Sequence, residues 1–298
     1  MRTQEVDKLK PPCTYQGGKQ RLAEQIIDII DSKIGLAGDV LFYDLCCGSG
    51  AVSLCLLNKG FKLDRLVMLD ASSYGLFYEL IGSGKFDLGL WDFYVKQVPE
   101  RERVQEYLEA LSKTNADEGE VYKYLLLQAG AFGGKQIHKS GNKFGNTSFR
   151  SYWQPTETSN RRSPVNPLSP MLEELDRRVH LLAEKLKGLR ALHCDIYKLL
   201  QDEQFINCDN KVIYIDPPYL NSTKYCAMFD LLEFLTQLKS TGTKGKLFIS
   251  EGVDLRQVSG LDSLITDAVQ LKISEGKGGI KGDRKKFKSE WLNMMTLD

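Results

Sequence analysis

Short apolar runs alternate with helical patterns along this chain, and that alternation leaves few folds open to it. Seven runs rich in β-branched or aromatic residues predict strands at 40–45, 66–69, 189–193, 212–215, 247–250, 269–273 and 291–296. Helices are predicted at 21–30, 50–57 and 171–186, the last with Ser169 and Pro170 as its cap and first-turn proline. Such alternation predicts an α/β fold with a mostly parallel, doubly wound sheet. A short basic linker joins the last two runs, which predicts an antiparallel hairpin at the sheet edge.

The alternation is interrupted between residues 84 and 168. This region contains an acid-rich helical stretch, a basic loop rich in Gly, Asn and Ser, and the proline-punctuated segment RRSPVNPLSP. We therefore expect a sheet domain formed by residues 1–83 and 169–298. Residues 84–168 are expected to form an insertion, with a role of its own, between the second and third strands.

Charge is distributed unevenly along the chain, although its net value is only +1. Residues 135–162 carry six Lys or Arg against one acid, and residues 272–288 carry seven against two. Two local basic surfaces on a nearly neutral chain indicate a polyanion that touches particular faces. A solvated loop is the alternative explanation for either run alone.

The chain carries no sequence signal for a membrane or for export. No run approaches the roughly 18 apolar residues of a membrane span, and MRTQEVDKLK at the start lacks an apolar signal core. The seven cysteines, an odd number without C-x-x-C spacing, are typical of reduced thiols. We therefore expect a cytoplasmic protein that does not bind a membrane.

The segment Asp216-Pro217-Pro218-Tyr219 directly follows the apolar run KVIYI. Two consecutive prolines stiffen the backbone and remove two N–H donors, so their carbonyl groups keep a fixed direction. A carboxylate before them and an aromatic ring after them suit an amine attached to an aromatic ring, such as N6 of adenine. Asp216 and the Pro217 carbonyl would accept the two amine hydrogens, which frees the nitrogen lone pair, and Tyr219 would stack on the base. A plain turn at a strand end is the alternative.

A second segment, DLCCGSG from Asp44 to Gly50, runs from a predicted strand through a glycine turn into a helix. Gly48 and Gly50 allow a tight turn and a close approach of ligand to backbone. Position 53 is Ser, so the dinucleotide motif G-x-G-x-x-G is incomplete. Asp70 ends the next strand about 20 residues later, where an acid typically binds the ribose of an adenosine ligand. This combination favours S-adenosylmethionine over NAD as the cofactor.

Two further segments complete the predicted ligand site. The segment YQGGK, from Tyr15 to Lys19, precedes the first predicted helix and offers N–H donors for a carboxylate such as the methionine end of that cofactor. A flexible loop is the alternative for this segment. Asp195 follows the third predicted strand. It would either accept from the adenine amine of the cofactor or cap a helix, and both interpretations remain open.

In this order, YQGGK, DLCCGSG, LDASS and DPPY resemble the motifs of the Dam-type (alpha-group) DNA N6-adenine methyltransferases. The resemblance covers most of the chain, and AFGG (131–134) and KFGN (143–146) look like two pieces of the family's recognition insertion. It implies a Rossmann-like S-adenosylmethionine-dependent methyltransferase sheet with an antiparallel last strand and an inserted target-recognition subdomain. It also implies a cytoplasmic location in a bacterial or phage-infected cell.

The resemblance further implies which residues act. Catalysis would fall to Asp216, Pro217, Pro218 and Tyr219. The implied cofactor contacts are Tyr15, Gly17, Gly18, Lys19, Asp44, Cys46, Cys47, Gly48, Gly50, Asp70, Asp195 and Ile196. Relatives often carry an aromatic or small residue where this chain has Cys46-Cys47, a departure that would change packing against the cofactor without removing binding.

The predicted reaction is an in-line transfer of the sulfonium methyl group to N6, without a covalent enzyme intermediate. An adenine in double-stranded DNA must first be flipped out of the helix. The basic region supplies candidate DNA contacts, namely Lys135, Lys139, Lys143, Asn146, Arg150 and Tyr152. Phe144, Phe149 and Trp153 lie among them, and a small core under a long loop is the alternative interpretation for the aromatic residues.

Other functions of the same motifs remain as alternatives. The substrate would then be cytosine N4, adenine in RNA or a glutamine side chain. Ser usually replaces the Asp in cytosine-N4 enzymes and Asn does so in glutamine enzymes, so Asp216 favours adenine. A non-catalytic nucleic-acid-binding protein on a methyltransferase scaffold is a further alternative, which the intact DPPY and glycine turn oppose.

One cysteine and the three histidines of the chain receive no role in the predicted site. Cys13 follows Pro12 like the nucleophile of cytosine-C5 enzymes, but it precedes the cofactor motifs, so we assign it no catalytic role. His138, His180 and His193 lack metal-ligand spacing, so no metal is predicted.

Overall fold

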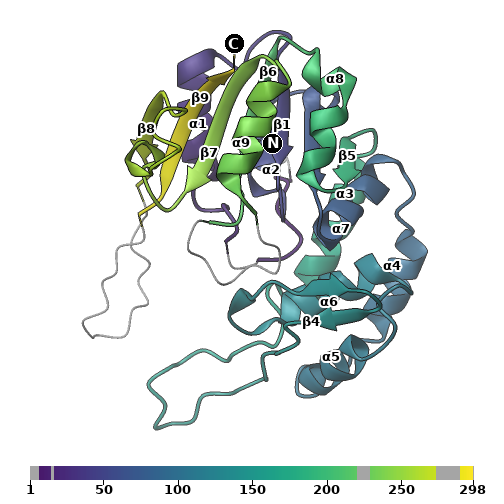
Figure 1. The fold of residues 1–298 in the computed structure, drawn as a ribbon. Coiled ribbons are helices and arrows are strands. Elements are labelled where there is room, and N and C mark those ends of the chain that lie inside the picture. Colours follow the sequence, from purple (N-terminus) through teal and green to yellow (C-terminus); the bar gives the residue numbers. More distant parts are fainter. Residues whose placement is uncertain (1–6, 15–16, 220–228, 273–288, 298) are drawn as a thin grey trace, which may run out of the picture.

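A seven-stranded sheet forms the centre of the protein, whose computed structural model describes residues 7–14, 17–219, 229–272 and 289–297 (Figure 1). The spatial order is β5 (Arg190–His193), β2 (Leu66–Asp70), β1 (Leu41–Leu45), β6 (Lys211–Ile215), β7 (Gly245–Glu251), β9 (Trp291–Leu297) and β8 (Asp267–Gln270). The first five strands in this order are parallel, while β9 is antiparallel to both β7 and β8. The predicted fold class, a mostly parallel Rossmann-like sheet with an antiparallel last strand, is confirmed.

All seven predicted strands are present, and six of them begin and end within two residues of the predicted bounds. The exception is β8, which ends at Gln270, whereas the prediction extended to Ile273, a residue outside the described part of the chain. The predicted antiparallel pairing of the last two strands is confirmed. The last strand does not lie at the edge, because β9 separates β8 from β7.

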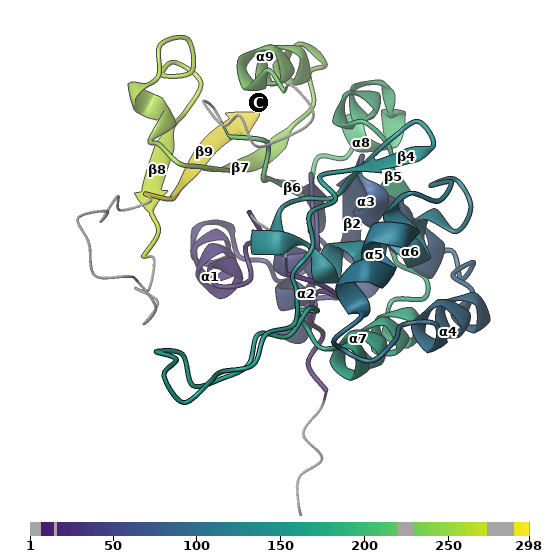
Figure 2. The same cartoon turned by 90° about the horizontal axis from the view of Figure 1, so that it is seen from below.

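The strands are buried on both faces because successive side chains point to opposite sides of a sheet. In β6, Val212 and Tyr214 belong to one apolar cluster, and Ile213 and Ile215 belong to another. The first cluster is covered by α1 (Ala23–Ile34), α2 (Ala51–Asn58) and α3 (Ser73–Gly82). The second is covered by α8 (Glu203–Ile206) and α9 (Leu231–Ser240). Figure 2 shows α1 and α2 on one side of the sheet and α8 and α9 on the other.

Helices α1, α2 and α7 (Leu172–Lys185) match the predicted helices at 21–30, 50–57 and 171–186. The predicted capping of the last one is wrong, because Met171 is the N-cap of α7 and makes no side-chain cap hydrogen bond. Among the described residues, no helix has the length and apolar character needed to cross a bilayer.

The region 84–168 folds into helices and a small hairpin. Its helices are α4 (Leu88–Lys96), α5 (Val104–Ser112) and α6 (Glu120–Gly130), and its hairpin pairs β3 (His138–Ser140) with β4 (Lys143–Gly145). Figure 1 shows these elements grouped below the sheet. Every residue of α6 from Val121 to Gly130 is buried, and its side chains join the same apolar cluster as α3 and α7. The sequence predicted a loop where the hairpin lies.

Candidate active site

A cavity of about 740 Å³ lies at the carboxyl ends of the parallel strands. Residues that end or follow four strands line it: Cys46 and Gly48 after β1, Asp70 in β2, Asp195 after β5 and Asp216 after β6. This edge is where open α/β sheets bind ligands. The structure therefore brings together residues that the sequence analysis took from separate segments. Ile196 and Pro218, also predicted for the site, line the same cavity.

The glycine turn is tied to the end of β2 by the carboxylate of Asp70. The Gly48 N–H donates to Asp70 Oδ2 at 2.7 Å, and the Ser72 N–H donates to Oδ1 at 2.8 Å. The Ser72 hydroxyl also donates to Oδ1. A carboxylate accepts about four hydrogen bonds, so Asp70 retains capacity for a ligand hydroxyl on the cavity side.

The turn itself has a backbone that demands glycine. Gly50 adopts a φ of 76°, and a Cβ there would lie 2.5 Å from the Tyr78 hydroxyl oxygen. Cys46 adopts a φ of 59°, an uncommon conformation for a residue with a side chain. Burial raises the pKa of both Cys46 and Cys47 well above the usual value, so both remain thiols.

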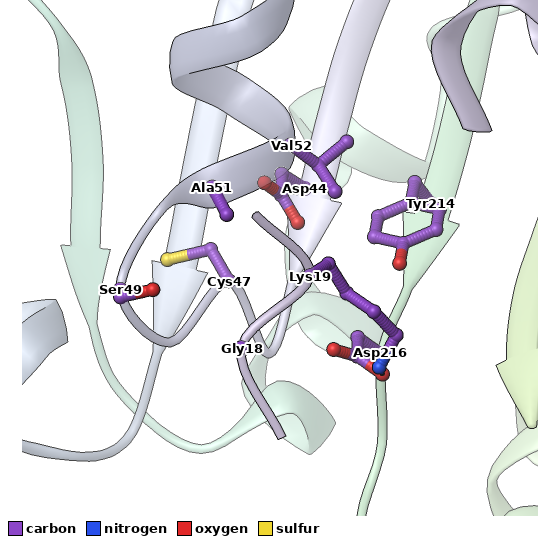
Figure 3. A pocket seen from close by; sticks show the side chains of 9 residues that line it. All are labelled: Gly18, Lys19, Asp44, Cys47, Ser49, Ala51, Val52, Tyr214 and Asp216. Carbon is purple, nitrogen blue, oxygen red and sulfur yellow. The ribbon is translucent and has the colours of Figure 1, made fainter. Parts of the chain in front are cut away.

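Asp44, which lies in β1, faces a second and much smaller space of about 10 Å³, enough for one water (Figure 3). The Ser53 hydroxyl and N–H donate to Asp44 Oδ2 at 2.6 and 3.2 Å. Asp44 Oδ1 is buried, with no hydrogen-bond partner within the described ranges. Burial raises the pKa of Asp44 to about 7, and the Ser53 hydrogen bonds offset this only in part. Gly18, Cys47 and Asp216 also line this space.

The predicted catalytic residue Asp216 forms an ion pair with Lys19. The Lys19 Nζ lies 2.6 Å from Asp216 Oδ1 and 3.5 Å from Glu290 Oε1. Figure 3 shows the Lys19 side chain extending from the loop before α1 to the Asp216 carboxylate. The ammonium lies 4.8 Å from the centre of the Tyr219 ring, and the Tyr219 hydroxyl donates to Glu290. Burial raises the pKa of Asp216 to about 6, although the Lys19 ammonium acts in the opposite direction.

Glu290, which contacts Lys19 and Tyr219, is a residue that the sequence analysis missed. It directly precedes β9, whose first residue Trp291 pairs with Glu251 at the carboxyl end of β7. Because β9 is antiparallel, its beginning lies at the edge where the parallel strands end. An acid just before a predicted antiparallel strand was the signal that could have revealed it.

The first predicted cofactor segment is only partly described. Tyr15 lies outside the described residues. Gly17 adopts a φ of 100°, and its carbonyl accepts from Lys19 Nζ at 3.4 Å. Lys19 was expected at a cofactor carboxylate, and in the structure its ammonium contacts the carboxylate of Asp216.

For Asp195 the structure shows the helix cap, one of the two interpretations that the sequence left open. Its Oδ1 accepts from the Tyr197 N–H at 2.9 Å, which caps the short helical segment from Ile196 to Gln201. Asp195 is also exposed on the wall of the cavity. The cap and a ligand contact therefore do not exclude each other.

The structure places the predicted DNA-binding residues in different surroundings. Lys139 lines the cavity, where its Nζ pairs with Asp117 at 2.7 Å and Glu120 at 2.8 Å. Lys135 and Lys143 are exposed. The Asn146 side chain donates to the Gln136 carbonyl, and the Arg101 guanidinium lies 4.7 Å from the centre of the Tyr152 ring. Phe144 and Phe149 are buried in the main apolar cluster, which supports the core interpretation for these two, whereas Trp153 is exposed.

Arg150 holds the end of α6 and its Ala substitution is expected to destabilise the protein. Its guanidinium donates to the carbonyls of Ala129 and Ala131 at 3.0 and 3.2 Å, and both of those residues are fully buried. Arg150→Ala should lower the free energy of unfolding by about 2 kcal/mol, because two hydrogen bonds from a charged donor are lost, although each carbonyl keeps a backbone donor, Ser169 N–H for Ala129 and Gly134 N–H for Ala131. Urea denaturation measures this. Lys143→Ala, at an exposed position, is the control and should change stability by less than about 0.5 kcal/mol. If Arg150→Ala kept wild-type stability and showed a weaker salt dependence of DNA binding, Arg150 would contact a DNA phosphate as the sequence analysis expected.

Two residue groups lie away from the cavity. His180 Nε2 lies 3.0 Å from Asp92 Oδ1 and 3.5 Å from Asp176 Oδ1, so the group joins α4 to α7. Trp91 Nε1 donates to the same Asp176 at 2.7 Å, which accounts for the cluster as a helix contact. Cys13 is fully buried, and burial raises its pKa to about 12, which supports its exclusion as a nucleophile.

No protein-family model and no curated protein matches the chain. Among solved structures, the chain matches two structures of the rRNA methyltransferase AviRa from Streptomyces viridochromogenes, with TM-scores of 0.44 and 0.43. The sequence identity is 12% in both, over 100% of this chain and 94% of that chain. At these scores the matches carry no conclusion about the activity or substrate of this chain.

Proposed function

We propose that this protein is an S-adenosylmethionine-dependent methyltransferase that acts on the N6 amine of adenine in DNA. One observation carries the proposal. The carboxylate of Asp216, held at the end of β6 by the rigid Pro217-Pro218 pair, opens on the same cavity as the glycine turn, Asp70 and Asp195. A ligand with an adenosyl group and a substrate amine could thus meet at one edge of the sheet.

The cavity residues fit the adenosyl part of this cofactor. Asp70 has acceptor capacity left for one ribose hydroxyl, and Asp195 lies on the same wall for the adenine amine. The Gly48 backbone, without a side chain, permits close approach. Asp44 Oδ1, buried and unpaired among the described residues, faces the small space beside Asp216 and suits an ammonium group or a bound water. Bound there, the cofactor would supply an electrophilic methyl group.

The residues of the chain would prepare the amine for transfer. Asp216 and the Pro217 carbonyl accept the two N6 hydrogens, which increases the electron density on a nitrogen whose lone pair is otherwise delocalised into the ring. The Tyr219 ring provides a face for stacking the base. Holding both reactants in the reactive geometry would lower the barrier further, because the entropy cost of bringing them together is then met by binding. Lys19 keeps Asp216 ionised until the amine arrives.

The rate of methyl transfer should fall in acid. Asp216 must be ionised to accept from the amine, and burial raises its pKa to about 6. The single-turnover rate constant should therefore be constant well above pH 6 and fall about tenfold per pH unit below it. An aspartate with the usual pKa of about 3.9 would place this decline below pH 5. A rate constant that is flat from pH 8 to pH 5 would contradict the proposed role of this carboxylate.

Within this proposal, residues 84–168 contact the DNA, and the exposed Lys135 and Lys143 are its phosphate contacts. Lys143→Ala should weaken DNA binding by a similar factor for all sequences and lower the slope of log affinity against log salt by about one. Fluorescence anisotropy at several salt concentrations measures both. A loss confined to one DNA sequence would instead indicate base recognition by this residue.

The direct test of the proposal is product analysis. Purified protein is incubated with isotopically labelled S-adenosylmethionine and with DNA or RNA, and the nucleic acid is digested to nucleosides. Labelled N6-methyl-2′-deoxyadenosine from DNA, with no label in RNA, supports the proposal. The proposal is contradicted by labelled N4-methyl-2′-deoxycytidine, by label in RNA only, or by no label with either substrate. If calorimetry detects no cofactor binding, a non-catalytic protein is favoured.

A further inference from the structure

Glu290 lies beside Lys19 and Tyr219, a position that none of the sequence motifs predicts. Its side chain is about nine-tenths buried and comes from the start of β9, the strand that lies between β7 and β8. A buried carboxylate is costly unless it is hydrogen-bonded or paired. Glu290 Oε1 satisfies this condition by accepting from the Tyr219 hydroxyl and by lying 3.5 Å from Lys19 Nζ.

The first consequence concerns the Tyr219 ring. Two prolines fix the backbone on one side of Tyr219, and the hydrogen bond to Glu290 fixes the far end of its side chain. Burial and the nearby carboxylates raise the pKa of Tyr219, so the phenol keeps its proton and remains a donor. The plane of the stacking ring is thus set by a residue that lies 71 positions along the chain.

The second consequence concerns Lys19. Its ammonium lies 2.6 Å from Asp216 and 3.5 Å from Glu290, and the Lys19 side chain is only 7% exposed. When Asp216 accepts the substrate amine, it must share or release this ammonium. Glu290 is a second carboxylate within reach of the Lys19 ammonium. The ammonium can therefore keep a charged partner in the buried site while Asp216 binds the amine.

We propose that Glu290 is a positioning residue of the transfer site, which orients the Tyr219 ring and receives the Lys19 ammonium while Asp216 holds the substrate amine. The role depends on the proposed function, because it assigns an amine to Asp216. Glu290 itself touches neither reactant in this arrangement.

The substitution Glu290→Gln tests this role, because glutamine keeps the size of the side chain and its acceptor oxygen but removes the charge. The kcat should fall about 10- to 100-fold, as is typical when a reacting group is misplaced. The cofactor dissociation constant, measured by calorimetry, should change less than about twofold. Glu290→Asp, which restores the charge, should recover part of kcat.

A pH profile separates positioning from structural damage. Asp216 is faced by Lys19, Glu290, Tyr219, Tyr214, Asp44 and Asp70. Glu290 raises the pKa of Asp216, so its neutralisation should move the acid limb of the rate profile to lower pH. General loosening of the site would lower the rate without such a shift.

The matched control is Asp254→Asn. Asp254 is also a buried carboxylate near the end of β7, but its ion-pair partner is Arg256, whereas the partners of Glu290 are Tyr219 and Lys19. The Asp254→Asn variant should have a lower free energy of unfolding and the wild-type kcat. Wild-type kcat and an unmoved acid limb in Glu290→Gln would overturn the proposal, as would an equal loss of kcat in Asp254→Asn. Wild-type protein that methylates no adenine contradicts the proposed function, whereas active wild type with an unaffected Glu290→Gln contradicts only the role of Glu290.

Discussion

Asp216→Ala is expected to lower the single-turnover rate of adenine methylation by about a thousandfold. In the proposed mechanism this carboxylate is the charged one of the two acceptors that make N6 nucleophilic, and removal of one preorganised polar partner typically costs 10²- to 10³-fold. The protein should stay folded, because the Lys19 ammonium lies 3.5 Å from Glu290 and retains that partner. Cofactor affinity should change little, since the proposed contacts of the adenosyl group are Asp70 and Asp195.

Three measurements decide this prediction. Circular dichroism and urea denaturation establish that Asp216→Ala folds, and calorimetry measures cofactor binding. The control is Asp267→Asn, which removes another paired carboxylate, 2.8 Å from Lys33 and half-exposed on β8. It should keep the wild-type rate. A folded Asp216→Ala protein that turns over as fast as wild type would remove the basis of the proposed mechanism.

Among substitutions of glycine by alanine near the site, Gly75→Ala should destabilise the protein most. Gly75 lies in the first turn of α3, and a Cβ there would lie 1.9 Å from the carbonyl oxygen of Asp70. The obstacle is backbone, so no side-chain rotation relieves it, and α3 must move away from β2. We expect a loss of about 3 kcal/mol or more in the free energy of unfolding. Because Ser72, which caps α3 and donates to Asp70, would move with the helix, cofactor affinity should fall at least about tenfold.

Gly89→Ala is the matched control for this helix substitution. Gly89 is exposed in α4, and its nearest neighbour would be the end of the Asp87 side chain at 3.2 Å. Its stability should stay within about 1 kcal/mol of wild type. Urea denaturation and calorimetry compare the two variants. Equal stability of Gly75→Ala and Gly89→Ala would show that α3 does not depend on this close approach.

The sheet could be predicted from the sequence because its strands are local signals. Each of β1, β2 and β6 is a continuous run of buried residues, so its position needs no knowledge of its neighbours. The spatial position of β9 between β7 and β8 is a long-range property, and the sequence indicated only that the last two strands pair. Helix α3 was not predicted, because SYGLFYELIG is apolar around most of its circumference and lacks an amphipathic pattern.

The parts of the candidate site that lie at the ends of parallel strands could be predicted from the sequence. Asp70, Asp195 and Asp216 line the predicted cavity because each follows a parallel strand. Contacts between distant segments could not be predicted. The pairing of Lys19 with Asp216 joins residues 197 positions apart, and the hydrogen bonds from Arg150 to the end of α6 depend on how the chain returns from the hairpin. A count of basic residues does not distinguish Arg150 from the exposed Lys143.

Helix α6 has a consequence for engineering. Its Tyr124 ring packs edge-on against Tyr74 of α3, and Trp91 of α4 is hydrogen-bonded to Asp176 of α7. If residues 84–168 were replaced by the corresponding segment of a relative, the side chains of the new segment would not fit the surfaces of α3 and α7 in this protein. Reprogramming by exchange of whole segments would have to carry the matching surfaces of α3 and α7 along, whereas changes limited to the exposed rim of the β3–β4 hairpin would leave that shared interior intact.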